Sequence, residues 1–216
     1  MFSEKYAKHY EMFNRSKPYK QEIEFVYSWA GEPKKILDLG CGIAHYWKYY
    51  PKAVKISGLE KSKEMINRSP YHDRIANYDV TEAIACAWEK VDLVTALFDV
   101  INYIPVHNWW DRLPLKKGGY YIFDLWNADK VKKDGFRKTV KVVDGVTRVI
   151  TPVLVGGGVV DLKIEVMNGW AIEHTEMHRL YIYDRKTIEK FCGDSFEIEE
   201  VKETESWQQW LKLRRK

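Results

Sequence analysis

The sequence predicts an α/β fold in which helices cover both faces of a mostly parallel seven-stranded sheet. Between residues 34 and 126, five short apolar segments alternate with longer amphipathic stretches, which is the pattern of parallel strands joined by crossover helices. Beyond residue 126 the apolar residues alternate with period two and turn residues interrupt them, which is typical of antiparallel strands. At 216 residues the chain is long enough for one such domain with an elaboration.

Residues 1–33 are expected to form two helices that act as a lid. Tyr6, Tyr10 and Phe13 recur at helical spacing, and a second apolar set recurs between residues 23 and 29. The segment NRSKP separates the two sets and breaks the helical pattern. Because these aromatic residues precede the predicted sheet, we assign this region to an N-terminal helical lid.

Residues 34–126 carry the expected parallel strands. The segments are KKILDLG, VKISGLE, RIANYDV, VDLVTAL and GGYYIFDLW. Each is short and apolar, as expected for strands of a sheet that is covered on both faces. The stretches between them are longer and mix apolar with charged residues, which favours helices.

Residues 127–183 are expected to form an inserted antiparallel meander of about four strands. The dipeptides Asp-Gly at 144–145 and Asn-Gly at 168–169 are hairpin turn signals, and three glycines at 156–158 mark another break. Residues 184–216 then supply one more helix, DRKTIEKFCG, and two strands, FEIEEVKE and SWQQWLKLRR. These two strands bring the core sheet to seven.

The charge pattern argues against a nucleic-acid partner. The net charge is +4 at pH 7, and four of the basic residues lie in the last five positions, so the rest of the chain is nearly neutral. Charges of both signs alternate in the remaining charged runs, which indicates solvated helix faces. A nucleic-acid-binding domain more often carries a basic stripe.

Cysteine usage and apolar runs indicate a cytoplasmic protein. Cys41, Cys86 and Cys192 are odd in number and widely spaced, which favours a reducing compartment and argues against a zinc cage. The N-terminal segment MFSEKYAKHYEMF is too charged for a signal peptide. The longest apolar run, VDLVTALFDVINYI, contains two aspartates, so no segment is suited to cross a membrane.

The segment ILDLGCGIAHYW predicts a ligand-binding turn. An apolar strand runs into Gly40, Cys41 and Gly42, and a helix is expected to follow. Backbone N–H groups and the positive end of a helix would then meet at the carboxyl edge of the sheet, where polar ligands bind. A dinucleotide fingerprint requires a third glycine, and that position is His45, so NAD is disfavoured.

Acidic residues follow the ends of three predicted strands. Asp38 precedes the glycines, Glu60 ends the second strand segment and Asp79 follows the third. A carboxylate at the end of the second strand can accept both ribose hydroxyls of a nucleoside. The other two would repel a pyrophosphate but attract a cationic ligand with an amino group.

Five segments in order resemble the motifs of class I S-adenosylmethionine-dependent methyltransferases: ILDLGCGIA, ISGLEKSKEMI, NYDV, VDLVTALFDVINYI and LKKGGYYIFDLW. The match covers residues 34–126. The flanking segments YAKHYEMFNRSKPY and GWAIEHTEMHRLYIY are similar to small-molecule N-methyltransferases, especially the amino-sugar N,N-dimethyltransferases. The resemblance implies a Rossmann-like core, S-adenosyl-L-methionine as cofactor with S-adenosyl-L-homocysteine as product, and an enzyme of EC 2.1.1 type.

The resemblance also implies roles for individual residues. Asp38 would reach the amino group of the cofactor through water, Glu60 would bind the ribose hydroxyls and Asp79 the adenine amino group. The full implied cofactor-binding set is Tyr19, Asp38, Gly40, Cys41, Gly42, Glu60, Lys61, Asp79, Val80 and Leu97. The family usually has glycine where this chain has Ala44, which predicts tighter packing beside the cofactor.

Tyr10 and His178 are the candidate catalytic residues. An aromatic pocket suits a cation, and Tyr10, Tyr19 and Trp47 are candidates for its walls, with ordinary packing as the alternative. If HTEMH is a strand, His174 and His178 share one face with Glu176. The two histidines would stand ~13 Å apart along the strand, too far to bind one metal ion, so no metal is expected. Either histidine could act as a base, and a solvent-facing position on an exposed sheet remains the alternative.

The expected acceptor is a small molecule with an amine nitrogen. The nucleic-acid amino-methyltransferases usually carry an [N/D]-P-P-[F/Y/W] tetrad, and the corresponding stretch here is LFDVINY. The meander is expected to cover the acceptor side, and a homodimer is the candidate assembly. Two alternatives stay open: a methyltransferase that acts on RNA or protein, and a non-catalytic nucleoside-binding module.

Overall fold

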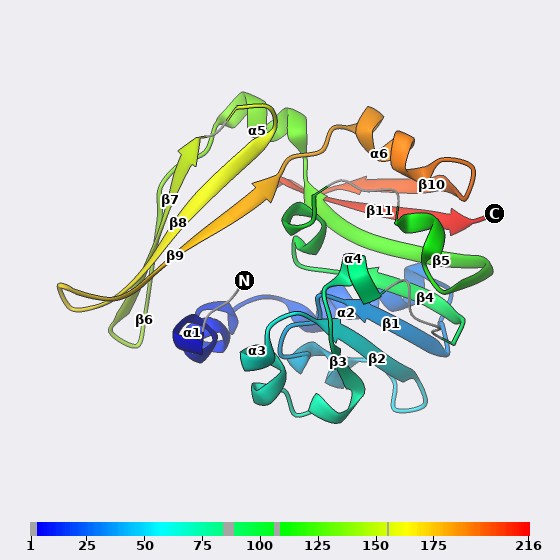
Figure 1. Cartoon of the computed structure of the whole chain (residues 1–216), viewed down its shortest axis with the longest axis horizontal. Coiled ribbons are helices and arrows are strands. Elements are labelled where there is room, and N and C mark those ends of the chain that lie inside the picture. Colours follow the sequence, from blue (N-terminus) through cyan, green and yellow to red (C-terminus); the bar gives the residue numbers. More distant parts are fainter. Residues whose placement is uncertain (1–3, 84–88, 106–108, 155) are drawn as a thin grey trace.

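The computed structural model describes residues 4–83, 89–105, 109–154 and 156–216, and it contains two sheets (Figure 1). The strands of the larger sheet are β1 (Lys35–Leu39), β2 (Lys55–Glu60), β3 (Ile75–Asn77), β4 (Val91–Ala96), β5 (Leu115–Trp126), β10 (Phe196–Glu203) and β11 (Gln208–Arg215). Their order in space is β10-β11-β5-β4-β1-β2-β3.

The larger sheet confirms the predicted mostly parallel arrangement. β1 to β5 pair in parallel, whereas β11 is antiparallel to both of its neighbours, β5 and β10. The strand order reverses direction between β1 and β4. In open α/β sheets, ligands bind outside the carboxyl ends of the strands at such a reversal.

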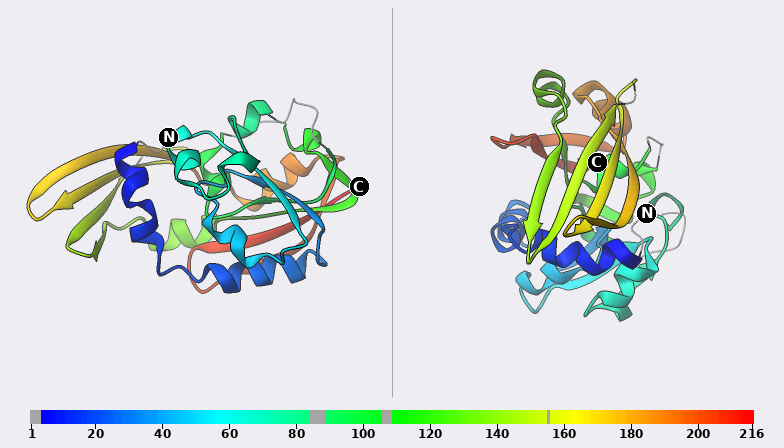
Figure 2. Two further views of the ribbon diagram at one scale, coloured as in Figure 1. Left: turned by 90° about the horizontal axis from the view of Figure 1, so that it is seen from below. Right: turned by 90° about the vertical axis from the view of Figure 1, so that its left-hand side faces the viewer.

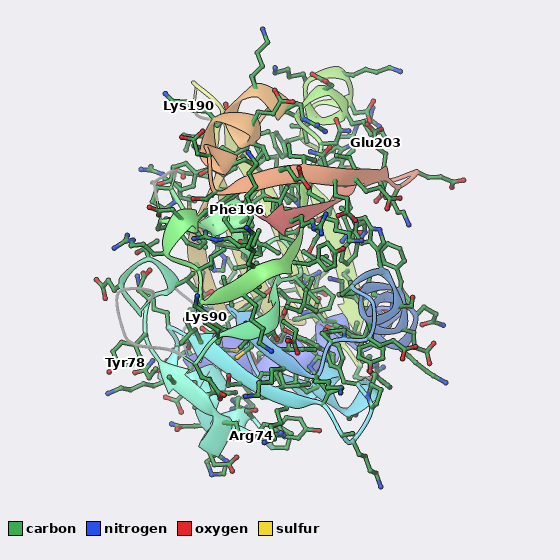
Figure 3. All side chains as sticks on the ribbon, turned by 90° about the vertical axis from the view of Figure 1, so that its right-hand side faces the viewer. Arg74, Tyr78, Lys90, Lys190, Phe196 and Glu203 are labelled. Carbon is green, nitrogen blue, oxygen red and sulfur yellow. The ribbon has the colours of Figure 1, made fainter. Side chains whose placement is uncertain are left out.

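Apolar side chains cover both faces of this sheet because successive residues of a buried strand point to opposite sides. Ile36 packs in the cluster beneath helix α2 (Tyr19–Trp29), whereas its neighbour Leu37 packs in the cluster beneath helix α6 (Arg185–Cys192). Figure 2 shows α2 running along one face of the sheet. In Figure 3, Phe196 lies within the filled interior, and Lys190 and Glu203 lie at the periphery.

The remaining helices are α1 (Glu4–Asn14), α3 (Lys63–Arg68), α4 (Val80–Ala83) and α5 (Ala128–Asp134), with 3₁₀ segments η1 (His45–Tyr49), η2 (His72–Arg74), η3 (Val100–Tyr103) and η4 (Trp110–Arg112). The two predicted N-terminal helices are present, but they differ in surroundings. α2 belongs to the core, since Ile23 and Val26 are fully buried. Only α1 lies apart from the large sheet, between the meander and α3 (Figure 1).

The segment after Gly42 does not begin the α-helix that the sequence predicts. Ala44 adopts a left-handed conformation with φ of +52°, and the five residues of η1 form a 3₁₀ turn. Tyr46 and Trp47 of this turn direct their polar atoms toward the side chain of Asp38. A turn this short has no substantial macrodipole, so the expected positive helix end is absent from this position.

The predicted meander is confirmed as a separate sheet of four antiparallel strands. These are β6 (Thr139–Val143), β7 (Val146–Leu154), β8 (Val159–Asn168) and β9 (Ala171–Tyr181), in sequential order. Asp144 and Gly145 form the first hairpin turn with φ of +49° and +79°, as the Asp-Gly signal predicts. One face of the meander packs on α1, where Ile164 and Val166 meet Tyr6 and Phe13 in a buried cluster.

Within the described residues, no helix is long and apolar enough to span a bilayer. Cys41 and Cys192 are buried free thiols. The third cysteine, Cys86, lies outside the described residues.

Replacement of Gly58 by alanine is expected to destabilise the fold. A Cβ atom at this position in β2 would lie 2.6 Å from Cys41 Sγ and 2.9 Å from Trp47 Cζ2. Overpacking of this kind typically costs about 1–3 kcal/mol. Gly156→Ala is the matched control, because among the described residues, its chain neighbours apart, no heavy atom lies within 4 Å of a Cβ built there. Urea unfolding of both variants measures the difference, and equal free energies of unfolding would contradict the packing at Gly58.

Candidate functional site

A cavity of about 290 Å³ opens at the carboxyl ends of the central strands. Its base consists of the loops that follow β1, β2 and β4, including Gly40, Gly42, Glu60 and Leu97. Its roof comes from α1 and from the inner face of the meander. The cavity thus lies where the strand order reverses, between parts of the chain that are far apart in sequence.

The glycine turn is required by space and by backbone conformation. Gly40 and Gly42 have φ of +62° and +57°, in the left-handed region that favours glycine. A Cβ atom on Gly40 would lie 2.8 Å from the side chain of Val100, and one on Gly42 would lie 3.3 Å from Met65 Cε. The backbone therefore approaches the cavity closely at both positions.

Glu60 ends β2 and lines the cavity. Its Oε1 accepts a hydrogen bond from the backbone N–H of Ser62 at 2.8 Å, and its Oε2 accepts one from Gly42 at 2.9 Å. Burial raises the pKa of this carboxyl group, and the backbone N–H groups of Ser62, Gly42 and Lys61 oppose that shift. Since a carboxylate offers about four acceptor positions, Glu60 retains capacity for ligand hydroxyls.

Asp38 does not line the cavity. Its side chain instead stabilises η1, the turn that follows the glycines. The carboxylate is 2% exposed and accepts three side-chain hydrogen bonds, from Tyr46 Oη, Trp47 Nε1 and Thr95 Oγ1, each at 2.7 Å. Burial raises its pKa to about 6, and the three donors limit the rise. The structure thus gives Asp38 a supporting position, and its contact with a cofactor amino group through water remains a prediction.

Asp79, Lys61 and Val80 lie beside the site but not on the described cavity wall. Asp79 comes two residues after the end of β3 and accepts hydrogen bonds from Thr81 N, Thr81 Oγ1 and Lys61 Nζ at 2.9, 2.7 and 2.6 Å. Burial opposes ionisation of Asp79, but Lys61 and Thr81 outweigh burial and lower its pKa. The sequence therefore brings these residues to the correct edge of the sheet, while their contact with a ligand stays a prediction.

Tyr19 and Trp47 are framework residues in this structure. The Tyr19 ring contacts the edges of His45 at 4.4 Å and Phe98 at 5.1 Å between ring centroids. Trp47 donates to Asp38 and packs against Tyr71. Neither ring lines the cavity, so of the three rings that the sequence suggests for an aromatic wall only Tyr10 lies on it.

The aromatic wall comes from Tyr6 and Tyr10 of α1 and from Tyr103 of η3. The rings of Tyr6 and Tyr10 meet edge to face with centroids 6.4 Å apart. Burial raises the pKa of Tyr10 well above its ordinary value. Of the two predicted catalytic residues, Tyr10 therefore reaches the cavity directly.

His178 reaches the cavity through Tyr103. Its Nδ1 lies 3.2 Å from Tyr103 Oη, and its Nε2 lies 2.8 Å from Glu176 Oε2. The other oxygen of Glu176 lies 3.0 Å from His174 Nε2. Asn102 fixes η3 against β9, since its Nδ2 donates to the Tyr181 carbonyl at 2.7 Å.

The prediction that His174, Glu176 and His178 share one face of a strand is confirmed. The solvent-facing alternative is wrong for the last two, because α1 and η3 pack on that face. Glu176 is 8% exposed and His178 is 3% exposed. In the part of the chain that the structure describes, no group of three His, Cys, Asp or Glu side chains is arranged to bind a metal ion.

A buried carboxyl pair that the sequence analysis did not single out also belongs to the site. Asp99 lines the cavity directly after Leu97 and Phe98, and Asp124 accepts hydrogen bonds from the backbone N–H groups of Phe98 and Asp99 at 2.6 and 3.1 Å. Phe98 and Asp99 both have left-handed backbones, with φ of +67° and +65°. Burial and the charge of Asp124 raise the pKa of Asp99.

One cation lies near the base of the cavity. Lys17 Nζ stands 4.1 Å from the centroid of the Phe98 ring, and the lysine lines the cavity. The segment NRSKP predicts a break between helices and is part of the segment that resembles small-molecule N-methyltransferases, but neither observation indicates a role for its lysine. The pair Phe98-Asp99 lay within the motif LFDVINY, but nothing in the sequence placed its carboxylate opposite Asp124.

No protein-family model matches the sequence, and no curated protein matches it as a relative. Solved structures do match. An S-adenosylmethionine-dependent methyltransferase from Clostridium acetobutylicum is 20% identical, with 98% of each chain covered and a TM-score of 0.80. CalS10 from Micromonospora echinaspora, an amino pentose methyltransferase whose structure holds bound S-adenosylmethionine, is 18% identical over 100% of this chain and 98% of that chain, with a TM-score of 0.76.

DesVI from Streptomyces venezuelae is also 18% identical, with 99% of this chain and 98% of that chain covered and a TM-score of 0.76. At these identities the likeness establishes the fold. The chain has the Rossmann-like fold of these proteins over nearly its whole length, as the sequence predicts.

The Asp38→Asn variant is expected to differ from the wild type in the pH dependence of stability. The Asp38 pKa of about 6 exceeds the value of about 3.9 in an unfolded chain, so the folded protein binds this proton more tightly. The contribution of Asp38 to stability is therefore present below pH ~4 and lost as pH rises to ~6. Between pH 4 and pH 7 the stability of the variant relative to the wild type should rise by about 2 to 3 kcal/mol.

Urea unfolding at several pH values measures this change. Asp144→Asn is the control, because the Asp144 side chain is 59% exposed and lies in a turn that asparagine also favours. Parallel stability curves for wild type and Asp38→Asn would contradict the role given to burial of Asp38.

Proposed function

We propose that this protein transfers a methyl group from S-adenosylmethionine to the amine nitrogen of a small molecule. The observation that carries the proposal is one cavity that extends from the glycine turn and Glu60 to Asp99, Tyr103 and the meander. Transfer between two bound molecules requires both to lie in one space, aligned and shielded from water. The methyltransferase names of the structures with this fold support the proposal, as does the resemblance of the sequence motifs.

The base of the cavity fits the cofactor. The close backbone approach at Gly40 and Gly42 would pass beneath the methionine and ribose portion, with Leu97 opposite. Glu60 would accept both ribose hydroxyls. The ammonium group of Lys17 would attract the carboxylate of the methionine portion.

The residues around the cavity complete this proposal. Asp38 would hold the glycine turn in place, and Asp79 with Lys61 would frame the adenine end. α1 would act as the lid, since it supplies Tyr6 and Tyr10 to the roof.

The acceptor end of the cavity suits an amine. When bound, the cofactor supplies a methyl group on a positively charged sulfur; the C–S bond breaks as the C–N bond forms, and a neutral thioether leaves. An amine attacks only as its free base, so an incoming ammonium group must first lose a proton. The carboxylate of Asp99 would attract this ammonium group toward the cofactor.

The chain from Tyr103 to Glu176 can take up the proton. Because the Glu176 carboxylate accepts from His178 Nε2, the Nδ1 atom of the neutral imidazole is left to accept from Tyr103 O–H. Tyr103 can then receive the proton of the ammonium group as it passes its own to His178. The resulting imidazolium would be stabilised by Glu176, as a buried carboxylate stabilises imidazolium in hydrolase triads.

An RNA or protein acceptor is the first rival. The roof formed by α1 and the meander favours a small acceptor, and the charge pattern gives no basic stripe. Labelled methyl transfer to amino sugars, amino acids, polyamines, tRNA and peptide pools tests the class. Label in tRNA or protein alone would favour the rival, and cofactor binding without any transfer would favour the non-catalytic module.

We also propose a cytoplasmic location and a homodimer. The free thiols of Cys41 and Cys192 are compatible with a reducing compartment. Exposed apolar side chains on the meander offer an interface for a second copy: Val140, Val142, Trp170, Ile172 and Met177. Sedimentation analysis of the purified protein distinguishes monomer from dimer.

Glu60→Ala is expected to weaken S-adenosylmethionine binding without unfolding the protein. The variant loses its charge-assisted hydrogen bonds to ribose; since one such bond is typically worth ~1.5 to 3 kcal/mol, the dissociation constant should rise about tenfold to a hundredfold for one lost bond, and more if both are lost. Calorimetric titration measures the change, with the exposed Glu82→Ala as control. An unchanged dissociation constant in Glu60→Ala would refute the ribose contact.

His178→Ala is expected to lower turnover at least about a hundredfold while cofactor affinity changes little, because general-base assistance is typically worth ~10²- to 10⁴-fold. Tyr103→Phe should lower turnover as well, since it removes the link to the cavity. Both losses should shrink as pH rises and the amine deprotonates in solution. Steady-state rates across pH measure this, with Met177→Ala on the outer face of β9 as control. A pH-independent loss would argue against proton transfer through this chain.

A further inference from the structure

Arg148 is the cation of the meander that faces the cavity. We infer that it forms an anion-binding subsite at the acceptor end, so that the acceptor is an amine that also carries a carboxylate or a phosphate. This inference rests on the proposed methyl transfer and names its substrate class.

The position of Arg148 in the meander directs it inward. It lies in β7, two residues before Ile150, and pairs across the sheet with the fully buried Val166. The rest of the cavity wall on this sheet is aliphatic, formed by Ile150, Leu162, Ile164 and Leu180. A guanidinium group is therefore placed among apolar side chains, on the opposite side of the cavity from the glycine turn.

The guanidinium group of Arg148 makes fewer hydrogen bonds than its N–H donors allow. Its Nη1 donates to Tyr6 Oη at 3.3 Å, and its Cζ lies 5.0 Å from the centroid of the Phe13 ring. Its Nε is buried and has no hydrogen-bond partner among the described residues. Arginine carries five N–H donors, and a buried N–H group without an acceptor is costly, so the Nε side of the guanidinium can accommodate an oxyanion of a ligand.

The charged groups around Arg148 do not supply that acceptor. Glu176 lies on the same side of the meander in β9, but its two oxygens lie 3.0 Å from His174 Nε2 and 2.8 Å from His178 Nε2. Lys141 on the neighbouring strand β6 directs its Nζ to the Phe13 carbonyl and to Ser16 Oγ. α1 and η3 present the phenol groups of Tyr6 and Tyr103. Within the described ranges, no carboxylate forms an ion pair with Arg148.

The edge that Nε shares with Nη2 fits an oxyanion that presents two oxygens side by side. Carboxylates and phosphates accept two parallel hydrogen bonds from this edge of arginine, which lysine cannot reproduce. The ammonium group of the acceptor would lie beside Asp99 near the base of the cavity, and its anionic group would lie beside Arg148 in the roof. An acceptor with both groups would be oriented along the cavity, with its nitrogen toward the transferred methyl group.

Matched acceptor pairs test the subsite. Labelled methyl transfer is measured at saturating S-adenosylmethionine for tyrosine against tyramine and for glucosamine 6-phosphate against glucosamine, so that the two pairs distinguish carboxylate from phosphate. The wild type should prefer the anionic member of at least one pair by about tenfold or more in kcat/KM, the value of one charge-assisted contact. Arg148→Met should abolish the preference, and Arg148→Lys should retain part of it.

Lys141→Met is the matched control. Like Arg148, Lys141 donates a hydrogen bond from the meander to α1, but its side chain does not line the cavity. A variant that only loosens α1 should lower the rates of both members of a pair equally, so the preference should survive in Lys141→Met. Survival of the preference in Arg148→Met, or no preference in the wild type, would overturn the subsite.

If none of the four acceptors is methylated, binding replaces turnover as the measurement. Calorimetry of the S-adenosylhomocysteine-loaded protein with inorganic phosphate and with acetate should show saturable binding that Arg148→Met removes. A protein that binds S-adenosylhomocysteine but neither anion contradicts the subsite alone. A protein that does not bind S-adenosylhomocysteine contradicts the proposed function and this inference together.

Discussion

The buried carboxylate of Asp38 is the interaction on which the base of the site depends. It receives hydrogen bonds from Thr95 in the neighbouring strand β4 and from Tyr46 and Trp47 in η1, so it joins two central strands to the 3₁₀ turn that follows β1. These bonds compensate for burial of a polar group that would otherwise be costly. They also explain why the chain forms a tight 3₁₀ turn after the glycines, because an α-helix would present the two aromatic residues in other directions.

The roof of the cavity follows a different principle. An aliphatic sheet face packs on the aromatic residues of α1, and its polar groups are gathered in two places: the row His174, Glu176 and His178 on β9, and Arg148 on β7. Glu176 lies between the two histidines, with Oε1 3.0 Å from His174 Nε2 and Oε2 hydrogen-bonded to His178 Nε2, which defines the orientation of the His178 ring. The base is built largely from the strand ends and loops of the large sheet, and the roof from side chains of α1 and the meander.

The sequence predicted those features that depend on local pattern. The strands, the Asp-Gly hairpin and the position of Glu60 at the end of β2 follow from periodicity and turn chemistry, and the structure confirms them. Other features depend on tertiary contacts that one sequence does not reveal. The position of Asp38 before the glycines predicts a role at the ligand site. The sequence does not show its hydrogen-bond donors, because they come from Tyr46 and from Thr95, 57 positions away in the chain. Nothing in the sequence indicates Tyr103 as a site residue, because its partner His178 lies 75 positions away in the chain.

The position of β11 has a consequence for folding during synthesis. β11 lies between β5 and β10 although it follows both in the chain. Until the ribosome has produced it, β5 presents unpaired backbone groups along one edge, and β10 has no neighbour in the sheet. Such edges pair readily with other chains. The nascent protein can therefore assemble β1 to β5 early, but it depends on the late arrival of β11, or on a chaperone in the interval, to close the aggregation-prone edge of β5.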